Sequence, residues 1–111
     1  RALFTDLGKE SLLRDLIPML DNFEAAFANK AAWEETPETW RVGIEYIYNQ
    51  FLQTLEQHGV SQFGQVGDEF DAALQEVIQS EPEEATKVTK VVQRGYMLRE
   101  KVIRPAKVHL G

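Results

Sequence analysis

Two stretches in the first half of the chain repeat apolar residues with the period of an α-helix. In each stretch the apolar side chains fall within an arc of roughly 140° around the helix axis. Ser11 is a candidate N-cap for the first stretch, with continuation of the helix upstream as an equal alternative, and Pro18 within the stretch should bend the helix. Its apolar residues are Leu12, Leu13, Leu16, Ile17, Leu20, Phe23 and Phe27. Those of the second stretch are Trp40, Ile44, Ile47, Tyr48, Phe51, Leu52 and Leu55. We therefore predict two amphipathic helices.

The limits of the second helix are marked by local signals. Residues 29–36 lack a helical period and are expected to form a connection. The Thr-Pro-Glu triplet at 36–38 then predicts a helix start, because a capping hydroxyl precedes a proline and an acidic residue. Gly59, directly after His58, predicts the end of this helix.

Two helices with apolar arcs this wide cannot cover each other completely. Pairing two such hairpins from two chains would bury the remainder in a four-helix bundle, so the pattern predicts a homodimer. The alternative is that the C-terminal half covers this surface within one chain. If the dimer forms, we expect its interface to contain Leu13, Leu16, Leu20, Phe23, Ile44, Ile47, Phe51 and Leu55.

The second half of the chain has the composition of short strands. Residues 60–66 are flanked by glycine and anchored by Phe63, whereas 73–80 are ambiguous between helix and strand. Residues 87–98 are rich in β-branched side chains and predict a strand. Gly95 within that strand predicts a bulge or a close backbone approach.

The last segment predicts a hairpin. Residues 99–100 are expected to form its turn, and the alternating pattern of 102–110 predicts a second strand. Its even-numbered residues should share one face. Pro105 cannot donate a ladder hydrogen bond, so this strand is expected to lie at an edge or to carry a bulge there.

Charge is divided unevenly along the chain. Residues 1–85 hold 5 Lys or Arg and 17 Asp or Glu, whereas residues 86–111 hold 7 Lys or Arg and one acid, Glu100. One interpretation is that these basic residues only protect strand edges from pairing with other chains. The other is that they belong to a protein-binding surface with a basic rim and an apolar centre. The rim would consist of Arg94, Arg99, Lys101 and Arg104, and the centre of Val92, Met97 and Ile103. Nucleic acid is not the expected partner, since the acidic remainder repels phosphate and no nucleic-acid-binding motif is present.

Catalysis is not expected. The two histidines, His58 and His109, form no recognisable catalytic or metal-binding motif, and no phosphate-binding glycine loop occurs. We expect no cofactor and no metal. The chain has no cysteine, which fits a reducing compartment such as the cytoplasm, and no apolar run that could span a membrane. Because it starts with Arg1 rather than Met, we expect it to be a fragment.

Four blocks of the sequence carry a family resemblance: LLRDLIPMLDNFEAAF (12–27), GIEYIYNQFLQTLEQHGV (43–60), VGDEFD (66–71) and VVQRGYMLREKVIRPAKV (91–108). In order, spacing and charge they resemble the GrpE family, the nucleotide-exchange factors of DnaK-type chaperones. The resemblance implies an α+β fold. Residues 1–58 would form the end of a long helix and two helices of a dimeric four-helix bundle, and residues 59–111 a small, mainly β domain that contacts the chaperone.

The resemblance also implies a function in protein folding and the stress response without covalent chemistry. The β domain would bind the ATPase domain of the chaperone and open its cleft, so that ADP leaves. The expected contact residues are Val92, Arg94, Met97, Lys101, Arg104 and Pro105, with a weaker contact from Gly43 and Glu45. The competing hypothesis is a dimeric interaction scaffold that has the fold but no exchange activity.

The chain departs from the family pattern at several positions. Glu24 stands where family members often have arginine, and Ala72 replaces the proline of a Phe-Asp-Pro triplet. Lys101 replaces an arginine, which keeps the charge but loses bidentate geometry. These departures affect individual contacts rather than the expected fold.

Overall fold

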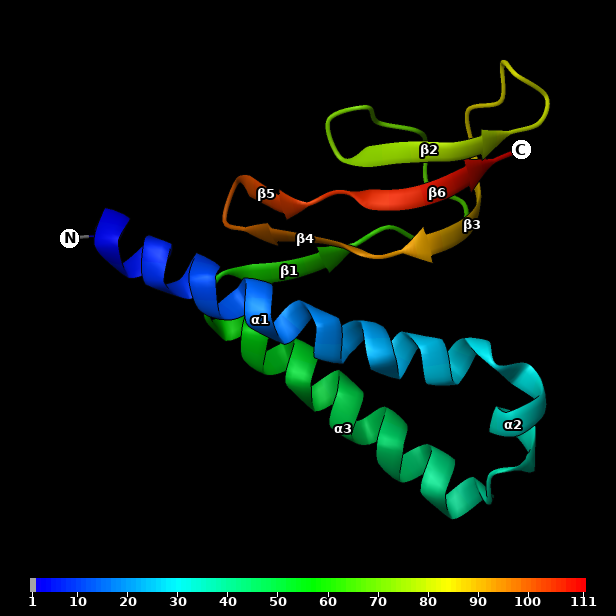
Figure 1. Cartoon of the computed structure of the whole chain (residues 1–111), viewed down its shortest axis with the longest axis horizontal. Coiled ribbons are helices and arrows are strands. Elements are labelled where there is room, and N and C mark those ends of the chain that lie inside the picture. Colours follow the sequence, from blue (N-terminus) through cyan, green and yellow to red (C-terminus); the bar gives the residue numbers. More distant parts are fainter. Residues whose placement is uncertain (1) are drawn as a thin grey trace. The chain divides into compact units, whose positions relative to one another are not determined.

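The computed structural model describes the backbone of residues 2–111 and the side chains from Thr5 onward, so Arg1 of the expected helical domain lies outside the described residues. Three helices precede six strands (Figure 1), which confirms the α+β class. The chain divides into two compact units, one ending at His58 and the other beginning at Gly59. The elements are α1 (Ala2–Ala28), α2 (Lys30–Glu35), α3 (Glu38–Gln57), β1 (Val60–Phe63), β2 (Gln75–Ser80), β3 (Val88–Gln93), β4 (Gly95–Leu98), β5 (Lys101–Arg104) and β6 (Ala106–Leu110).

The first helix extends upstream of Ser11, which is one of the two alternatives that the sequence left open. It spans Ala2–Ala28 and runs through Gly8 and Pro18, so Ser11 is not its N-cap and the alternative of a continuation upstream is confirmed. One glycine disfavours a helix by only about 1 kcal/mol relative to alanine. A serine that could cap a helix therefore does not mark the helix start when the residues before it can also be helical.

The segment expected to be a connection contains helix α2. Asn29 caps it, because its side-chain oxygen accepts a hydrogen bond from the backbone N–H of Ala32. The Thr36 hydroxyl, which was expected to cap α3, instead donates to the carbonyl of Ala32 at 2.9 Å. The capping hydroxyl therefore closes the short helix rather than opening the next one.

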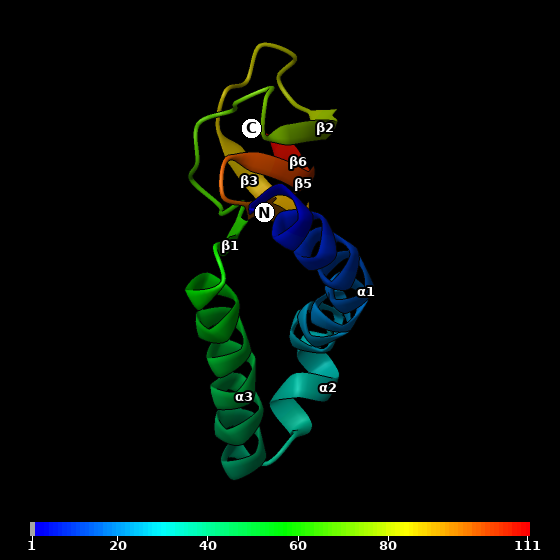
Figure 2. The same ribbon diagram turned by 90° about the vertical axis from the view of Figure 1, so that its left-hand side faces the viewer.

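Helix α3 begins directly after Pro37 and makes no side-chain N-cap hydrogen bond. It ends at Gln57, and Gly59 follows with φ of 81°, a value that glycine adopts without steric strain. The predicted helix end is thus confirmed. Figure 2 shows α1 and α3 as the arms of a helical hairpin that α2 closes at one end.

Aromatic side chains hold the closed end of this hairpin together. The Phe27 ring lies 5.0 Å from the Trp33 ring and 5.2 Å from the Tyr48 ring, centroid to centroid. Phe23 lies 5.5 Å from Tyr48. The Tyr48 hydroxyl donates to a carboxylate oxygen of Glu24 at 2.6 Å, so the buried ring is satisfied at its polar tip.

The second unit contains two three-stranded sheets, with strand orders β1-β4-β5 and β2-β6-β3. β2 and β6 are parallel, and all other neighbouring strands are antiparallel. The strand predicted over 87–98 is in fact two strands, because the chain changes sheets at Arg94. The close approach predicted at Gly95 is confirmed, since a Cβ there would lie 2.3 Å from Cζ of Phe63.

The C-terminal strand is also interrupted. β5 ends before Pro105 and β6 begins after it, and the buried positions change parity there: Ile103 is buried before the proline, and Ala106 and Val108 after it. The prediction that the even-numbered residues from Val102 onward share one face is therefore wrong. Proline breaks the ladder: β5, before it, lies at the edge of its sheet as expected, whereas β6, after it, is the central strand of the other sheet.

The core of this unit lies on β6 and β3. Its buried members are Val88, Ala106, Val108 and Leu110, against which Phe63, Ala85 and Val91 pack. Within the described residues, no helix combines the length and apolar character needed to cross a membrane.

Candidate partner-binding surface

The hairpin β4–β5 forms the centre of the surface that the sequence singled out. Its turn is at Arg99 and Glu100, as predicted, and Leu98 pairs with Lys101 across it. Arg99 has φ of 54°, and its backbone N–H donates to the carbonyl of Gly59 at 2.7 Å. The turn is therefore fixed to the start of the β unit.

Arg104 stabilises the hairpin from within the unit. Its Nε and Nη2 donate to the carbonyl of Arg94 at 3.2 and 2.7 Å. Its guanidinium carbon lies 5.4 Å from the ring centroid of Tyr96, a cation–π arrangement. Tyr96 is fully buried and its hydroxyl accepts a hydrogen bond from Gln62. Arg104 therefore links the end of β5 to the crossing between the sheets.

Arg94 occupies that crossing. Its Nη1 donates to the carbonyl of Gly64, and its own carbonyl accepts the bonds from Arg104. Both arginines were predicted only as contacts for a partner. The structure gives both a role inside the fold that a sequence pattern does not reveal, because the carbonyls that they bind are far away in the sequence.

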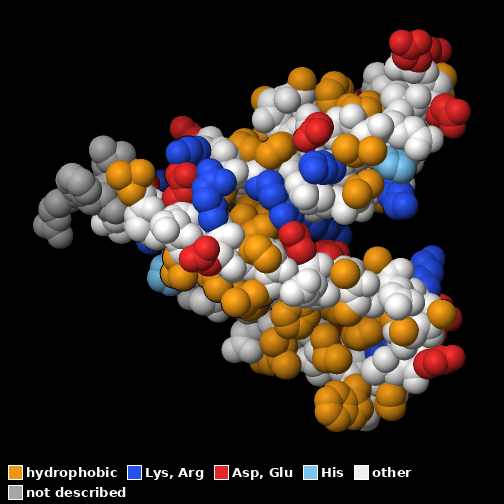
Figure 3. Space-filling view, in the orientation of Figure 1, with side chains coloured by type: hydrophobic (Ala, Val, Ile, Leu, Met, Phe, Trp, Pro, Cys, Tyr) orange, Lys and Arg blue, Asp and Glu red, His pale blue; other side chains and the backbone are white. Residues whose placement is uncertain are grey.

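Other predicted contact residues are directed outward. Val92 is 52 % exposed, and Lys101 and Pro105 are also exposed. Met97 is half-buried, whereas Ile103, expected at the apolar centre of the surface, is buried. Figure 3 shows Lys and Arg side chains gathered over the region of the β4–β5 turn. We call Val92, Met97, Lys101 and Pro105 the hairpin surface.

Gly43 and Glu45, the weaker contact candidates, lie exposed on α3. A Cβ at Gly43 would have no atom within 4 Å apart from the neighbours and local helix backbone that any residue has. The described chain therefore contains no neighbouring backbone that requires glycine there.

The helices carry apolar side chains at a regular spacing that remain accessible. On α3 these are Trp40, Ile44, Ile47 and Phe51, and on α1 they are Leu12, Leu16, Met19 and Phe23. In both helices the spacing is that of a heptad seam. Figure 3 shows hydrophobic side chains gathered over the part of the view where Figure 1 places these helices. We call these two sets the helical stripes.

The residues expected at the dimer interface differ in how exposed they are in the single chain. Leu13 and Leu20 are buried in the single chain, which leaves them little surface to offer a second chain. Ile47 is 54 % exposed, and Leu16, Phe23, Ile44, Phe51 and Leu55 are half-buried. Leu12 and Met19 were not selected, although their spacing from Leu16 and Phe23 was a usable signal.

Within the part of the chain that the structure describes, no group of His, Asp and Glu side chains is arranged to hold a metal ion. The hairpin surface offers exposed apolar and basic side chains.

Comparison with known proteins adds a family. The GrpE family model matches residues 4–111. Three proteins, each named Protein GrpE, are similar to this chain. The protein from Lactiplantibacillus plantarum is 34% identical over 103 residues, which cover 89% of this chain and 51% of that protein. The protein from Listeria monocytogenes is 35% identical over 105 residues, covering 92% and 54%. The protein from Latilactobacillus sakei is 35% identical over 103 residues, covering 89% and 51%. The chain thus spans about half the length of these relatives.

Proposed function

Because this chain belongs to the GrpE family, we propose that it is a co-chaperone which binds the ATPase domain of a DnaK-type chaperone and promotes release of ADP. The observation that carries the proposal is the hairpin surface, in which Lys101 is exposed at the start of β5, next to the β4–β5 turn, and Val92 is exposed on β3. Such a mixture of apolar and basic groups on an ordered element is typical of a protein-binding surface.

The proposed roles of the arginines follow from their contacts. Arg94 and Arg104 hold the crossing beneath the surface, so they position the contacting residues in addition to any contact of their own. Lys101 extends from the start of β5 and supplies positive charge for an acidic patch on the partner. Charge of this kind mainly accelerates encounter and selects partners.

Gly43 supports a second contact on α3. A glycine within a helix destabilises it by roughly 0.5–1 kcal/mol relative to alanine, and no neighbour within the described chain requires it. A partner whose surface approaches the helix backbone closely would explain its presence. Glu45, two residues further on and exposed, would lie beside that contact.

The exchange mechanism requires no catalytic group. The factor binds the open state of the ATPase domain better than the closed state, and nucleotide binds the closed state better. Each ligand then weakens the binding of the other by the same factor. ADP leaves because the open cleft holds it poorly, and ATP binding reverses the complex.

We also propose that two chains form the working molecule in the cytoplasm. The helical stripes support this, since apolar residues at heptad spacing on two joined helices fit a four-helix bundle with a second copy. The alternative function is a dimeric scaffold without exchange activity, which would keep the stripes but have no use for the hairpin surface.

Binding to the ATPase domain of a DnaK-type chaperone tests the proposal. Lys101→Glu should weaken binding at least about tenfold through charge reversal at the contact. Glu83→Lys, a charge reversal in the loop after β2, is the matched control and should bind normally. Equal binding by both variants and the unchanged chain would remove the hairpin surface from the proposal.

A further inference from the structure

Strand β2 leaves one edge of its sheet uncovered. The strand order is β2-β6-β3, and no strand of the described chain pairs with the outer side of β2. A strand in a parallel pair bonds to its neighbour through alternate residues, so about half of the backbone groups of β2 face this open edge. Such a row of N–H and C=O groups can accept a further strand.

The opposite edge of the same sheet is covered at the beginning of β3 by the chain itself. The N–H of Gly67 donates to the carbonyl of Val88 at 2.8 Å, and the N–H of Val88 donates to the carbonyl of Asp68 at 2.9 Å. The N–H of Phe70 donates to the carbonyl of Thr86 at 2.7 Å. The segment before β2 therefore pairs with the beginning of β3, whereas no such segment pairs with the outer side of β2 in the described chain.

The side chains of β2 are also accessible. Its residues from Glu76 to Gln79 are all exposed, including Ile78 at 50 %. The strand contains neither lysine nor proline, two residues that commonly protect edges. Two features oppose edge pairing, the charge of Glu76 and an irregularity in the β2–β6 pairing between Val77 and Gln79, so the regular edge extends from Gln75 to Val77.

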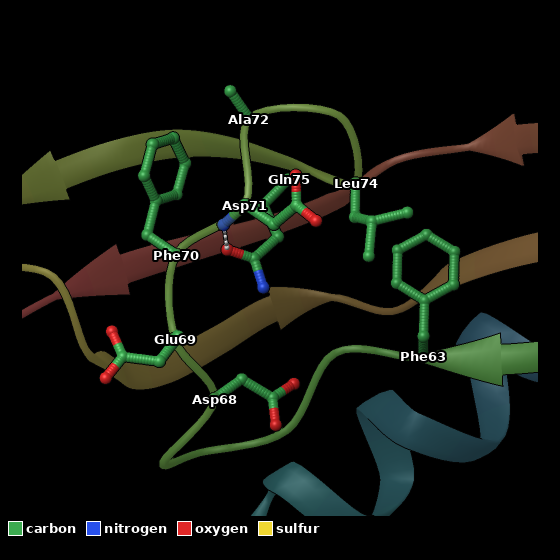
Figure 4. Close-up of a pocket in the computed structure, with 8 residues that line it drawn as sticks. All are labelled: Phe63, Asp68, Glu69, Phe70, Asp71, Ala72, Leu74 and Gln75. Atoms are coloured by element: carbon green, nitrogen blue, oxygen red, sulfur yellow. Dashed lines mark hydrogen bonds between the residues drawn. The ribbon is translucent and has the colours of Figure 1, made fainter.

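A pocket adjoins the beginning of this edge (Figure 4). The ring of Phe63 and the side chain of Leu74 lie on one side, Phe70 lies on the other, and Asp71 and Gln75 lie between them. The Asp71 backbone N–H donates to Oε1 of Gln75 at 3.2 Å, which ties the loop to the first residue of the strand. The pocket is therefore preformed, with an apolar lining at both ends.

The chain segment that contains the edge carries charge of one sign, although Lys107 on the neighbouring strand β6 lies opposite Glu76. Residues 66–85 contain seven Asp or Glu and no Lys or Arg. Three of these acids, Asp68, Glu69 and Asp71, line the pocket, and three more, Glu81, Glu83 and Glu84, follow the other end of β2. Glu69 forms an ion pair with Lys87 at 2.6 Å. The other acidic residues of the segment make the electrostatic potential near the pocket and the end of β2 negative.

We propose that the open edge of β2 and the adjoining pocket form a strand-addition site for an extended, basic peptide segment of another protein. The segment pairs through its backbone with Gln75–Val77, places one apolar side chain in the pocket between Phe70 and Leu74, and directs Lys or Arg side chains to the acids on either side. In this recognition mode main-chain hydrogen bonds supply affinity and pockets supply specificity. The site lies in the sheet that does not contain the β4–β5 hairpin, and it does not depend on the proposed exchange activity.

A fluorescent synthetic peptide of alternating lysine and valine with one central phenylalanine is a suitable probe for the complete chain. We expect it to bind, and a matched peptide with glutamate in place of lysine to bind at least about tenfold more weakly. Ile78→Lys should reduce binding of the lysine peptide by about tenfold through repulsion. Val42→Lys, the same kind of change at an exposed apolar residue of α3, should leave binding unchanged.

Two further measurements locate the probe. The Phe70→Ala variant should bind the phenylalanine-containing peptide more weakly than the unchanged chain does. The loss should be smaller for a peptide that has alanine in place of its central phenylalanine. In an NMR titration, the amide signals of Gln75–Ser80 should shift first. The proposal is overturned if the lysine peptide does not bind, if Ile78→Lys binds it as well as the unchanged chain, or if the shifts occur in β4 and β5 instead.

Discussion

Gly43 and Gly95 show how one residue type serves opposite purposes in this chain. At Gly95 the backbone passes so close to the Phe63 ring that a Cβ has no space, whereas Gly43 faces open space on a helix. The sequence predicted a close approach at Gly95 because glycine interrupted a strand of large residues. It could not predict that Phe63, more than thirty residues earlier, would fill the space.

Alanine at these two positions should have effects of opposite sign. Gly95→Ala should destabilise the β unit by about 1–3 kcal/mol, because the Phe63 ring has to move out of a packed site. Gly43→Ala should raise the stability of the helical unit by roughly 0.5–1 kcal/mol. Urea unfolding followed by circular dichroism measures both. A stable Gly95→Ala variant would mean that Phe63 has another place to pack.

Glu24 departs from the basic residue that the family often has, and the structure gives it a partner. It accepts a hydrogen bond from the Tyr48 hydroxyl within the aromatic cluster. Tyr48→Phe removes the donor while preserving the ring, so we expect a loss of about 1–3 kcal/mol in the stability of the helical unit, as for a hydrogen bond to a charged group. Thermal unfolding that matches the unchanged chain would show that water replaces the bond without loss.

At the scale of elements, amphipathic period was the most reliable guide. It identified α3, Gly59 identified the end of that helix, and local turn chemistry identified the β4–β5 turn. It failed where strands change sheets. The crossings at Arg94 and Pro105 depend on pairing between distant residues, so a local pattern interpreted each pair of strands as one. The short helix α2 was missed because six residues are too few to show a period.

Substitutions of the two basic residues of β5, Arg104 and Lys101, should affect stability and partner binding differently. Arg104→Met removes two hydrogen bonds to the Arg94 carbonyl and should destabilise the β unit by about 1–3 kcal/mol. Lys101→Met changes an exposed side chain and should alter stability by no more than about 0.5 kcal/mol, while it weakens binding to the ATPase domain. Unfolding curves and binding isotherms of both variants provide the comparison. Equal destabilisation by the two substitutions would contradict the role assigned to Arg104.

At the scale of the whole molecule, the contact candidates could be predicted in part. Val92, Lys101 and Pro105 are as exposed as a contact requires, but Ile103 is not, since the parity change at Pro105 turns it inward. The helical stripes were predicted as one arc on each helix. Which residues of that arc remain accessible depends on packing in three dimensions, and for this reason Leu12 and Met19 were overlooked.

The proposed dimer gives a prediction at this scale. Ile47→Lys places a charge in the centre of the α3 stripe and should convert the dimer to monomers at micromolar concentration, because burial of an unpaired charge is strongly unfavourable. Val42→Lys, exposed on another face of the same helix, should remain dimeric. Sedimentation velocity distinguishes the two. A wild-type chain that sediments as a monomer, or an Ile47→Lys variant that sediments as a dimer, would contradict the proposed bundle.

The release rate of a fluorescent ADP from the ATPase domain of a DnaK-type chaperone tests the central claim most directly. We predict that the rate rises with the concentration of this chain and then saturates, and that Lys101→Glu shifts the rise to higher concentration. A rate that stays flat up to concentrations at which the two proteins are shown to bind would contradict exchange activity and favour the scaffold.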